Sequence, residues 1–124
     1  EFQPGRKPGH HSRAAIPGTC SVKVRVLSPA LEEVADAALW FDSQRAGLGD
    51  EFWQAVDAIL SRIEENPLGF ARSEFATTEM DIRFALVQRF HYVIHFLAET
   101  DEVAIISVAH GARRPGYWLR RIRR

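Results

Sequence analysis

The chain has 124 residues, of which 46% are hydrophobic and 26% charged, a size and composition that fit one compact domain. Sixteen basic and sixteen acidic residues cancel to a formal net charge of zero, which argues against a general nucleic-acid coat protein. The single cysteine, Cys20, excludes an intrachain disulfide framework and a multi-cysteine zinc site, and it fits the reducing cytoplasm.

Residues 1–20 are rich in Pro, Gly and basic residues without periodicity, which predicts a disordered leader ahead of one domain at 21–124. The chain starts at Glu1 and its only methionine is Met80, so we hypothesise that part of this leader is a vector remnant or upstream translated sequence. No segment resembles a secretory signal, and no apolar run approaches the roughly 20 residues that span a bilayer. We therefore expect a cytoplasmic protein without a membrane partner.

Alternating valines predict a half-buried strand over 22–27. Ser28 and the proline after it are expected to cap and start a helix, whose apolar stripe ends at the Gly-Leu-Gly segment 47–49. Asp50, or the glycine before it, is expected to cap a second helix, which ends before Pro67. The short glycine link predicts that the two helices form an antiparallel hairpin.

Residues 67–80 are predicted to be a loop with a short edge strand near 73–76. Further strands are expected at 82–87, 91–98 and 103–110. The Arg-rich end of the chain is expected to form a short helix from Tyr117. The order β-α-α-β-β-β predicts an α+β fold, in which a helix hairpin packs on one face of a small, mostly antiparallel sheet.

The aromatic residues of the helices have two interpretations. Phe41 and Phe52 are most simply core residues that pack against the sheet. Trp40 and Trp53 project off the main apolar stripes, so either of them could instead cover a groove that binds a partner.

Three histidines are expected on one face of the last hairpin. If residues 99–102 form its turn, His91 lies opposite His110, and His95 shares their face, which we expect to be open. A metal site is the least favoured interpretation, because the nearby carboxylates lie at the hairpin tip. His110 could instead serve as an acid, a base or a phosphate contact. Ordinary packing is favoured for His91 and His95.

The zero net charge hides an asymmetry along the chain. Residues 29–66 contain nine acidic and two basic residues, whereas residues 111–124 contain six arginines and no acid. An anion site at one edge of the sheet could therefore use His110 and bidentate arginine contacts. Its candidate arginines are Arg83, Arg89, Arg113 and Arg114. The alternative is that these arginines are solvated or pair with the acidic helices.

Four segments in this order resemble the RelE/ParE superfamily of bacterial type II toxins, most closely its ParE or plasmid-stabilisation branch. The segments are GLGDEF at 47–52, IEENP at 63–67, IRFALVQRFHYVIHF at 82–96 and VAHGARRPGYW at 108–118. The resemblance implies a helix hairpin on a small sheet and a cognate antitoxin that neutralises the chain. It implies no metal and no cofactor.

The resemblance leaves two kinds of target. RelE-like members cleave messenger RNA in the ribosome, whereas ParE-like members poison DNA gyrase without cleaving RNA. In a metal-independent endoribonuclease, His110 and Tyr117 would supply acid and base. Developing charge would be stabilised by Arg83, Arg89 and Arg113.

The lysine content favours the protein-binding branch. Lys7 and Lys23 are the only lysines, whereas docking on a ribosome requires extensive phosphate neutralisation. We predict a ParE-like toxin that binds a macromolecule such as gyrase; a RelE-like ribonuclease and a non-toxic binding module are the alternatives. We expect it to form a homodimer or a complex with its antitoxin. The residues expected to bind partners or anions are Arg113, Arg114, Arg120, Arg121, His91 and His95.

Overall fold

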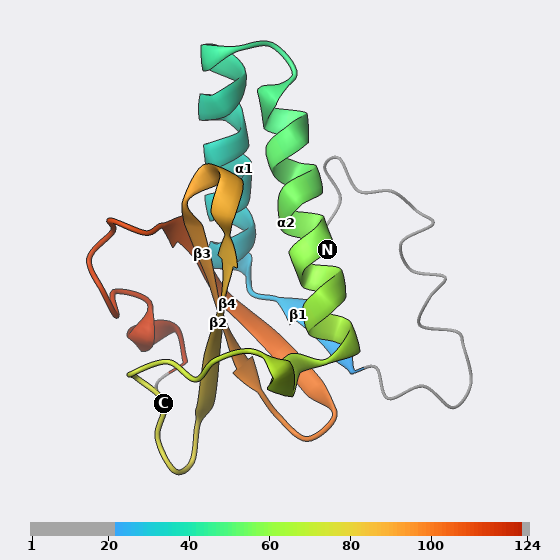
Figure 1. Cartoon of the computed structure of the whole chain (residues 1–124). Coiled ribbons are helices and arrows are strands. Elements are labelled where there is room, and N and C mark those ends of the chain that lie inside the picture. The colour runs from blue at the N-terminus through green and yellow to red at the C-terminus, as the bar shows by residue number, and fades with distance from the viewer. Residues whose placement is uncertain (1–21, 123–124) are drawn as a thin grey trace.

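A computed structural model describes residues 22–122, and the predicted leader at 1–20 lies outside them. The predicted order β-α-α-β-β-β is confirmed (Figure 1). The helices and strands are β1 (Lys23–Val26), α1 (Ser28–Gln44), α2 (Leu48–Glu65), β2 (Asp81–Val87), β3 (Tyr92–Ala98) and β4 (Glu102–His110). No helix among these residues is both long enough and apolar enough to cross a bilayer.

The four strands form one mixed sheet in the order β1-β4-β3-β2. β4, β3 and β2 are antiparallel neighbours, while β1 pairs with β4 in parallel. A parallel pair cannot be joined by a tight turn, so the chain crosses over between β1 and the rest of the sheet through the helix hairpin. The hairpin therefore covers one face of the sheet.

The main core lies between the helix hairpin and that face. α2 contributes Phe52, Val56 and Ile63, which recur at helical spacing and are fully buried. α1 contributes mainly small residues such as Ala30 and Ala38, so it can approach the sheet and α2 closely. The sheet side of this core includes Ile94, Phe96, Val103, Ile105 and Val108.

Both helix caps differ from the prediction. α1 begins after Leu27, whose carbonyl oxygen already accepts the first helical hydrogen bond, so Ser28 is a helical residue and not the cap. Gly47 caps α2 with a φ of 89°, and its carbonyl accepts the N–H of Glu51 at 3.2 Å. Asp50 therefore lies inside the helix. Glycine is favoured at position 47 because other residues rarely adopt this left-handed conformation.

At Gly49 the two helices approach each other closely. A Cβ atom at this position would lie 2.4 Å from the carbonyl oxygen of Ala38, which is too short for any real contact. The Gly49 N–H also donates to the Asp42 carboxylate at 2.7 Å. The glycine therefore fixes the spacing of the hairpin near its turn.

A β-bulge in β4 changes the predicted register. From Phe96 to Ala98 the pairing is as expected, but His95 pairs with Ser107, which leaves Ile106 without a partner. Beyond the bulge every pair is shifted by one residue, so His110 pairs with Tyr92 and not with His91. The expectation that three histidines share one face is therefore wrong.

The second face of the sheet is less open than expected. Ile82, Ile106 and Trp118 form a small separate core there, because the chain after β4 folds back across this face. The short helix expected from Tyr117 is a single 3-10 turn at Leu119–Arg121. The edge strand expected near 73–76 is absent, and one isolated bridge joins Arg72 to Arg83 instead.

Candidate functional site: a cleft with an arginine rim

A cleft of about 410 Å³ lies on the second face of the sheet. Its walls are the loop after α2 and the segment that follows β4, which we call the C-terminal segment (residues 111–122). The floor is formed by Phe84, Leu86, Val93, His95, Ser107 and Ala109. The walls and rim include Glu74, Phe75, His110, Arg113, Arg114, Tyr117 and Trp118.

His95 belongs to the floor as a neutral aromatic residue. Its ring lies 4.5 Å from the Trp118 ring and 6.1 Å from the Phe84 ring, measured between centroids. Burial lowers the pKa of His95 to about 4, because a charged imidazole would lose its solvation there. At neutral pH this histidine therefore carries no charge and contributes apolar surface.

Ser107 adds one polar group to this apolar floor. Its side chain is 1% exposed, and its hydroxyl has no hydrogen-bond partner in the part of the chain that the structure describes. Leaving a buried hydroxyl unpaired costs about 1–3 kcal/mol.

The rim carries the positive charge. Arg114 is exposed, and the Arg113 guanidinium stacks over the Tyr117 ring at 3.9 Å. His110 is also exposed, and its Nδ1 accepts the N–H of Ala112 at 3.0 Å. That contact leaves Nε2 as the atom that could exchange a proton with a ligand. Arg113, Arg114 and His110 therefore offer cations and one imidazole around an apolar floor.

Glu33 of α1 holds the wall of the cleft in place. Its carboxylate accepts the N–H of Val108 at 2.9 Å, the Tyr117 hydroxyl, and Nη2 of Arg121 at 2.9 Å. Arg121 also donates through Nη1 to the carbonyl of Ile106, the residue left unpaired by the bulge, at 2.9 Å. These bonds satisfy the outer edge of β4 where β1 no longer covers it.

The same network removes Tyr117 from proton transfer near neutral pH. Burial and the hydrogen bond to Glu33 raise the pKa of Tyr117 to about 12. The Tyr117 phenol therefore stays protonated and donates its hydrogen bond to Glu33. The Arg121 guanidinium beside it donates to Ile106 and to Glu33. Arg121 was expected to be a partner-binding or frayed-tail residue; it is 18% exposed in its side chain.

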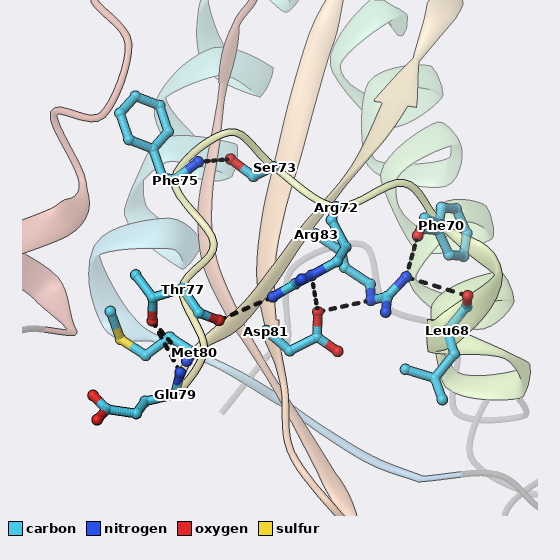
Figure 2. A network of polar contacts seen from close by, with 10 residues as sticks. All are labelled: Leu68, Phe70, Arg72, Ser73, Phe75, Thr77, Glu79, Met80, Asp81 and Arg83. Carbon is cyan, nitrogen blue, oxygen red and sulfur yellow. Dashed lines mark hydrogen bonds and ion pairs between the residues drawn. The ribbon is translucent and has the colours of Figure 1, made fainter.

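Arg83 and Arg89 lie outside the cleft and have local partners. Arg83 donates to the Asp81 carboxylate at 3.0 Å and to the carbonyl of Phe70 at 2.6 Å, which ties β2 to the loop before it (Figure 2). Arg89 pairs with Glu51 of α2, and this hydrogen bond is the main cause that lowers the pKa of Glu51. Neither guanidinium faces the rim residues.

The structure thus brings together only part of the predicted set. His95, His110, Arg113, Arg114 and Tyr117 line one cleft. His91 has a φ of 62° in the turn before β3 and is exposed, and Arg120 is exposed on the C-terminal segment; neither lines the cleft. Within residues 22–122 no cluster of His, Cys, Asp and Glu could hold a metal ion.

Three residues of the site were not predicted from the sequence: Glu33, Ser107 and Trp118. Trp118 stood within a quoted segment, but nothing indicated that it packs on His95. Ser107 interrupts an otherwise apolar strand, and this interruption is visible in the sequence. Glu33 carried no such signal, because its partners lie at least 75 residues away in the chain.

Comparison with solved structures identifies a protein of the same fold. The sequence matches no protein-family model and no curated protein. One solved structure, described as the chromosomal ParDE TA system from P. aeruginosa, contains a similar chain. The TM-score is 0.55 at 10% sequence identity, over 74% of this chain and 98% of that chain. This chain has the same fold. The fold implied by the RelE/ParE resemblance is therefore confirmed.

Proposed function

We propose that this chain is the toxin of a type II toxin–antitoxin module and acts in the ParE manner, by binding a macromolecular target such as DNA gyrase. The observation that carries the proposal is the fold shared with a chain of a ParDE TA system, together with the sequence segments quoted above. A cognate antitoxin would neutralise it in a complex, and both would act in the cytoplasm.

The contacts around the cleft support binding over catalysis. The Tyr117 hydroxyl donates a hydrogen bond to Glu33. Arg83 donates to backbone carbonyls and to Asp81, and Arg89 forms an ion pair with Glu51. An RNA-cleaving site needs an acid, a base and several cations within reach of one phosphate. Of the five groups proposed for that chemistry, two lie outside the cleft and a third is a fixed donor.

The cleft is the surface proposed for the partner. Its neutral floor suits an apolar side chain, and Arg113 and Arg114 suit a neighbouring carboxylate. A protein segment that alternates apolar and acidic residues has this chemistry.

Inducible expression tests toxicity, and a supercoiling assay tests the target. We expect growth arrest that is relieved by co-expression of the adjacent antitoxin gene, and inhibition of gyrase by purified chain free of antitoxin. If expression has no effect on growth while the chain still binds the antitoxin, the chain is a non-toxic binding module.

A RelE-like ribonuclease is the second candidate, because His110, Arg113 and Tyr117 do line one cleft. Primer extension on translated messages tests it. Cleavage that disappears in a His110→Ala variant would establish the nuclease. The absence of cleavage in cells whose growth is arrested would favour the ParE-like mechanism.

A further inference from the structure

The cleft on the second face of the sheet is closed at one end. Phe75, from the loop wall, lies 5.5 Å from the Trp118 ring between centroids. The two walls also meet at Gly116, where a Cβ atom would lie 3.0 Å from the Phe75 ring. Beyond this contact the space is filled by the small core of Ile82, Ile106 and Trp118. A continuous chain therefore cannot pass through the cleft, and a ligand enters from the other end.

The open end of the cleft leads into a second hollow. This hollow has a volume of about 360 Å³ and shares Leu86, Val93 and Gly111 with the cleft. Leu86 is 49% exposed, although it lies on the floor between the two hollows. Together they form one trough with an apolar floor, which is closed at the Phe75 end.

The closed end offers a ligand few polar groups. The Ser73 N–H donates to the Ile82 carbonyl at 2.7 Å, and the Phe75 N–H donates to Ser73 Oγ at 3.0 Å. The floor beside them carries the neutral ring of His95. A peptide backbone buried there would leave its own N–H and C=O groups without partners, which is unfavourable. An aromatic or hydrocarbon group carries no such cost.

The positive charge lies near the open end. His110 is the last residue of β4, and Arg113 and Arg114 follow it on the rim. The Arg113 guanidinium stacks on Tyr117, whereas Arg114 forms no hydrogen bond or ion pair with any residue of the described range 22–122. Glu74 lies on the opposite wall, so an anion is favoured beside the C-terminal segment.

We propose that this cleft is a binding site for small aromatic carboxylates. The aromatic group would lie on the floor near Trp118, and the carboxylate would face Arg114 at the open end. Rings in the floor and walls favour a flat aromatic ligand over a flexible alkyl chain, because they can stack on it. These rings belong to Phe75, Phe84, His95 and Trp118. A volume of about 410 Å³ holds a bicyclic ring system together with its carboxylate.

Such a ligand would occupy the surface proposed above for a protein partner. It presents the same two chemical groups, an apolar group and a carboxylate, in one small molecule. A bound aromatic carboxylate would therefore compete with that partner. The binding itself does not depend on the toxin function, so it is tested with the purified chain alone.

The test is an NMR titration of the isotope-labelled full chain with 2-naphthoate. The indole N–H signal of Trp118 reports on the cleft, whereas those of Trp40 and Trp53 report on positions outside it. The matched neutral probe is 2-naphthamide, which has the same ring system without the charge. The variant is Arg114→Gln. Its control is Arg120→Gln, which removes an exposed arginine of the C-terminal segment that does not line the cleft.

We expect 2-naphthoate to shift the Trp118 signal saturably, with a dissociation constant below about 1 mM, and to leave the Trp40 and Trp53 signals in place. The neutral amide, and 2-naphthoate on Arg114→Gln, should each bind about fivefold more weakly, while Arg120→Gln binds as the wild-type chain does. Equal shifts at Trp40 and Trp53, equal binding of the amide, equal weakening in Arg120→Gln or no saturable shift would overturn the proposal.

Discussion

The outer groove of the hairpin and the cleft on the far face of the sheet differ in charge but share an apolar base. The groove between α1 and α2 is lined by Asp42 and Asp50 beside apolar residues such as Ala38 and Trp53, whereas the cleft is bordered by Arg113 and Arg114. A formal net charge of zero therefore describes neither surface. The composition argues against binding along an extended phosphate backbone, but local recognition by each surface has to be judged separately.

Glu33 connects these two regions. It is the α1 carboxylate that contacts β4 and the C-terminal segment, whereas the other acidic residues of that helix lie in exposed positions. The hairpin thus supports the cleft wall through one residue of α1.

The largest effect is expected from breaking that connection. Glu33→Ala leaves the largely buried Arg121 without its partner and removes acceptors from Val108 and Tyr117, so we expect a loss of about 3–4 kcal/mol in the free energy of unfolding. Chemical denaturation measures it. Glu32→Ala is the control, since Glu32 is exposed on the same turn and should change stability by less than about 0.5 kcal/mol.

A smaller loss is expected when the hairpin itself is forced apart. Gly49→Ala places a Cβ atom against the Ala38 carbonyl, so the helices must shift, at a cost of about 2–3 kcal/mol. Thermal unfolding should show a lower Tm. Gly111→Ala is the matched control, because a Cβ there would meet only ordinary contacts, the nearest at 3.5 Å. Equal losses in both variants would contradict the close-approach argument.

The floor of the cleft predicts a pH dependence of stability. The pKa of His95 is about 4 in the folded chain and about 6.5 when unfolded, so the unfolded state binds the extra proton between these values. The contribution of His95 to the free energy of unfolding should be fully present above pH 6.5. It should fall by about 2 kcal/mol as the pH drops to 4, a figure reduced to allow for partial exposure of the ring.

His95→Phe isolates this contribution from the titration of carboxylates. The phenyl ring keeps an aromatic contact with Trp118 but cannot be protonated, so the variant should lose less stability between pH 6.5 and 4. His91→Phe is the control, because His91 is exposed. If the wild-type and His95→Phe curves are parallel, the floor is not a neutral apolar surface.

The smallest effect concerns the rim and appears only in partner binding. Arg114→Glu should weaken antitoxin binding about tenfold, because it reverses a charge at the mouth of the cleft without removing a structural contact. Arg120→Glu makes the same charge change at an exposed position outside the cleft and should have little effect. Equal weakening would mean that the tail contributes only general electrostatic attraction.

The helices and strands were predictable because their patterns are local. The valines of β1, the helical stripe of α2 and the polar turn before β4 each indicate one structure within a short window. The bulge in β4 was not predictable from the sequence. The strand is nearly all apolar around Ile106, and such a run has no alternation of polar and apolar residues to fix its register. The one-residue shift then placed His110 opposite Tyr92 and not opposite His91, although His95 and His110 both line the cleft.

The site was less predictable than the fold for a related reason. Arg83, Arg89 and Arg121 are chemically equivalent in sequence to Arg113 and Arg114, and only tertiary contacts show that the first three form hydrogen-bonded pairs. Arg113 has a looser contact with Glu33, at 3.9 Å. The role of Glu33 likewise depends on donors that the bulge and the end of β1 leave free.

Growth arrest on inducible expression, compared across three chains, tests the central claim most directly. The claim is that the chain acts by binding through the cleft and not by catalysis. We predict arrest by the wild-type chain, retained arrest by His110→Ala and loss of arrest by Arg114→Glu, with equal expression of all three. No arrest by the wild-type chain, or loss of arrest in His110→Ala alone, would contradict it.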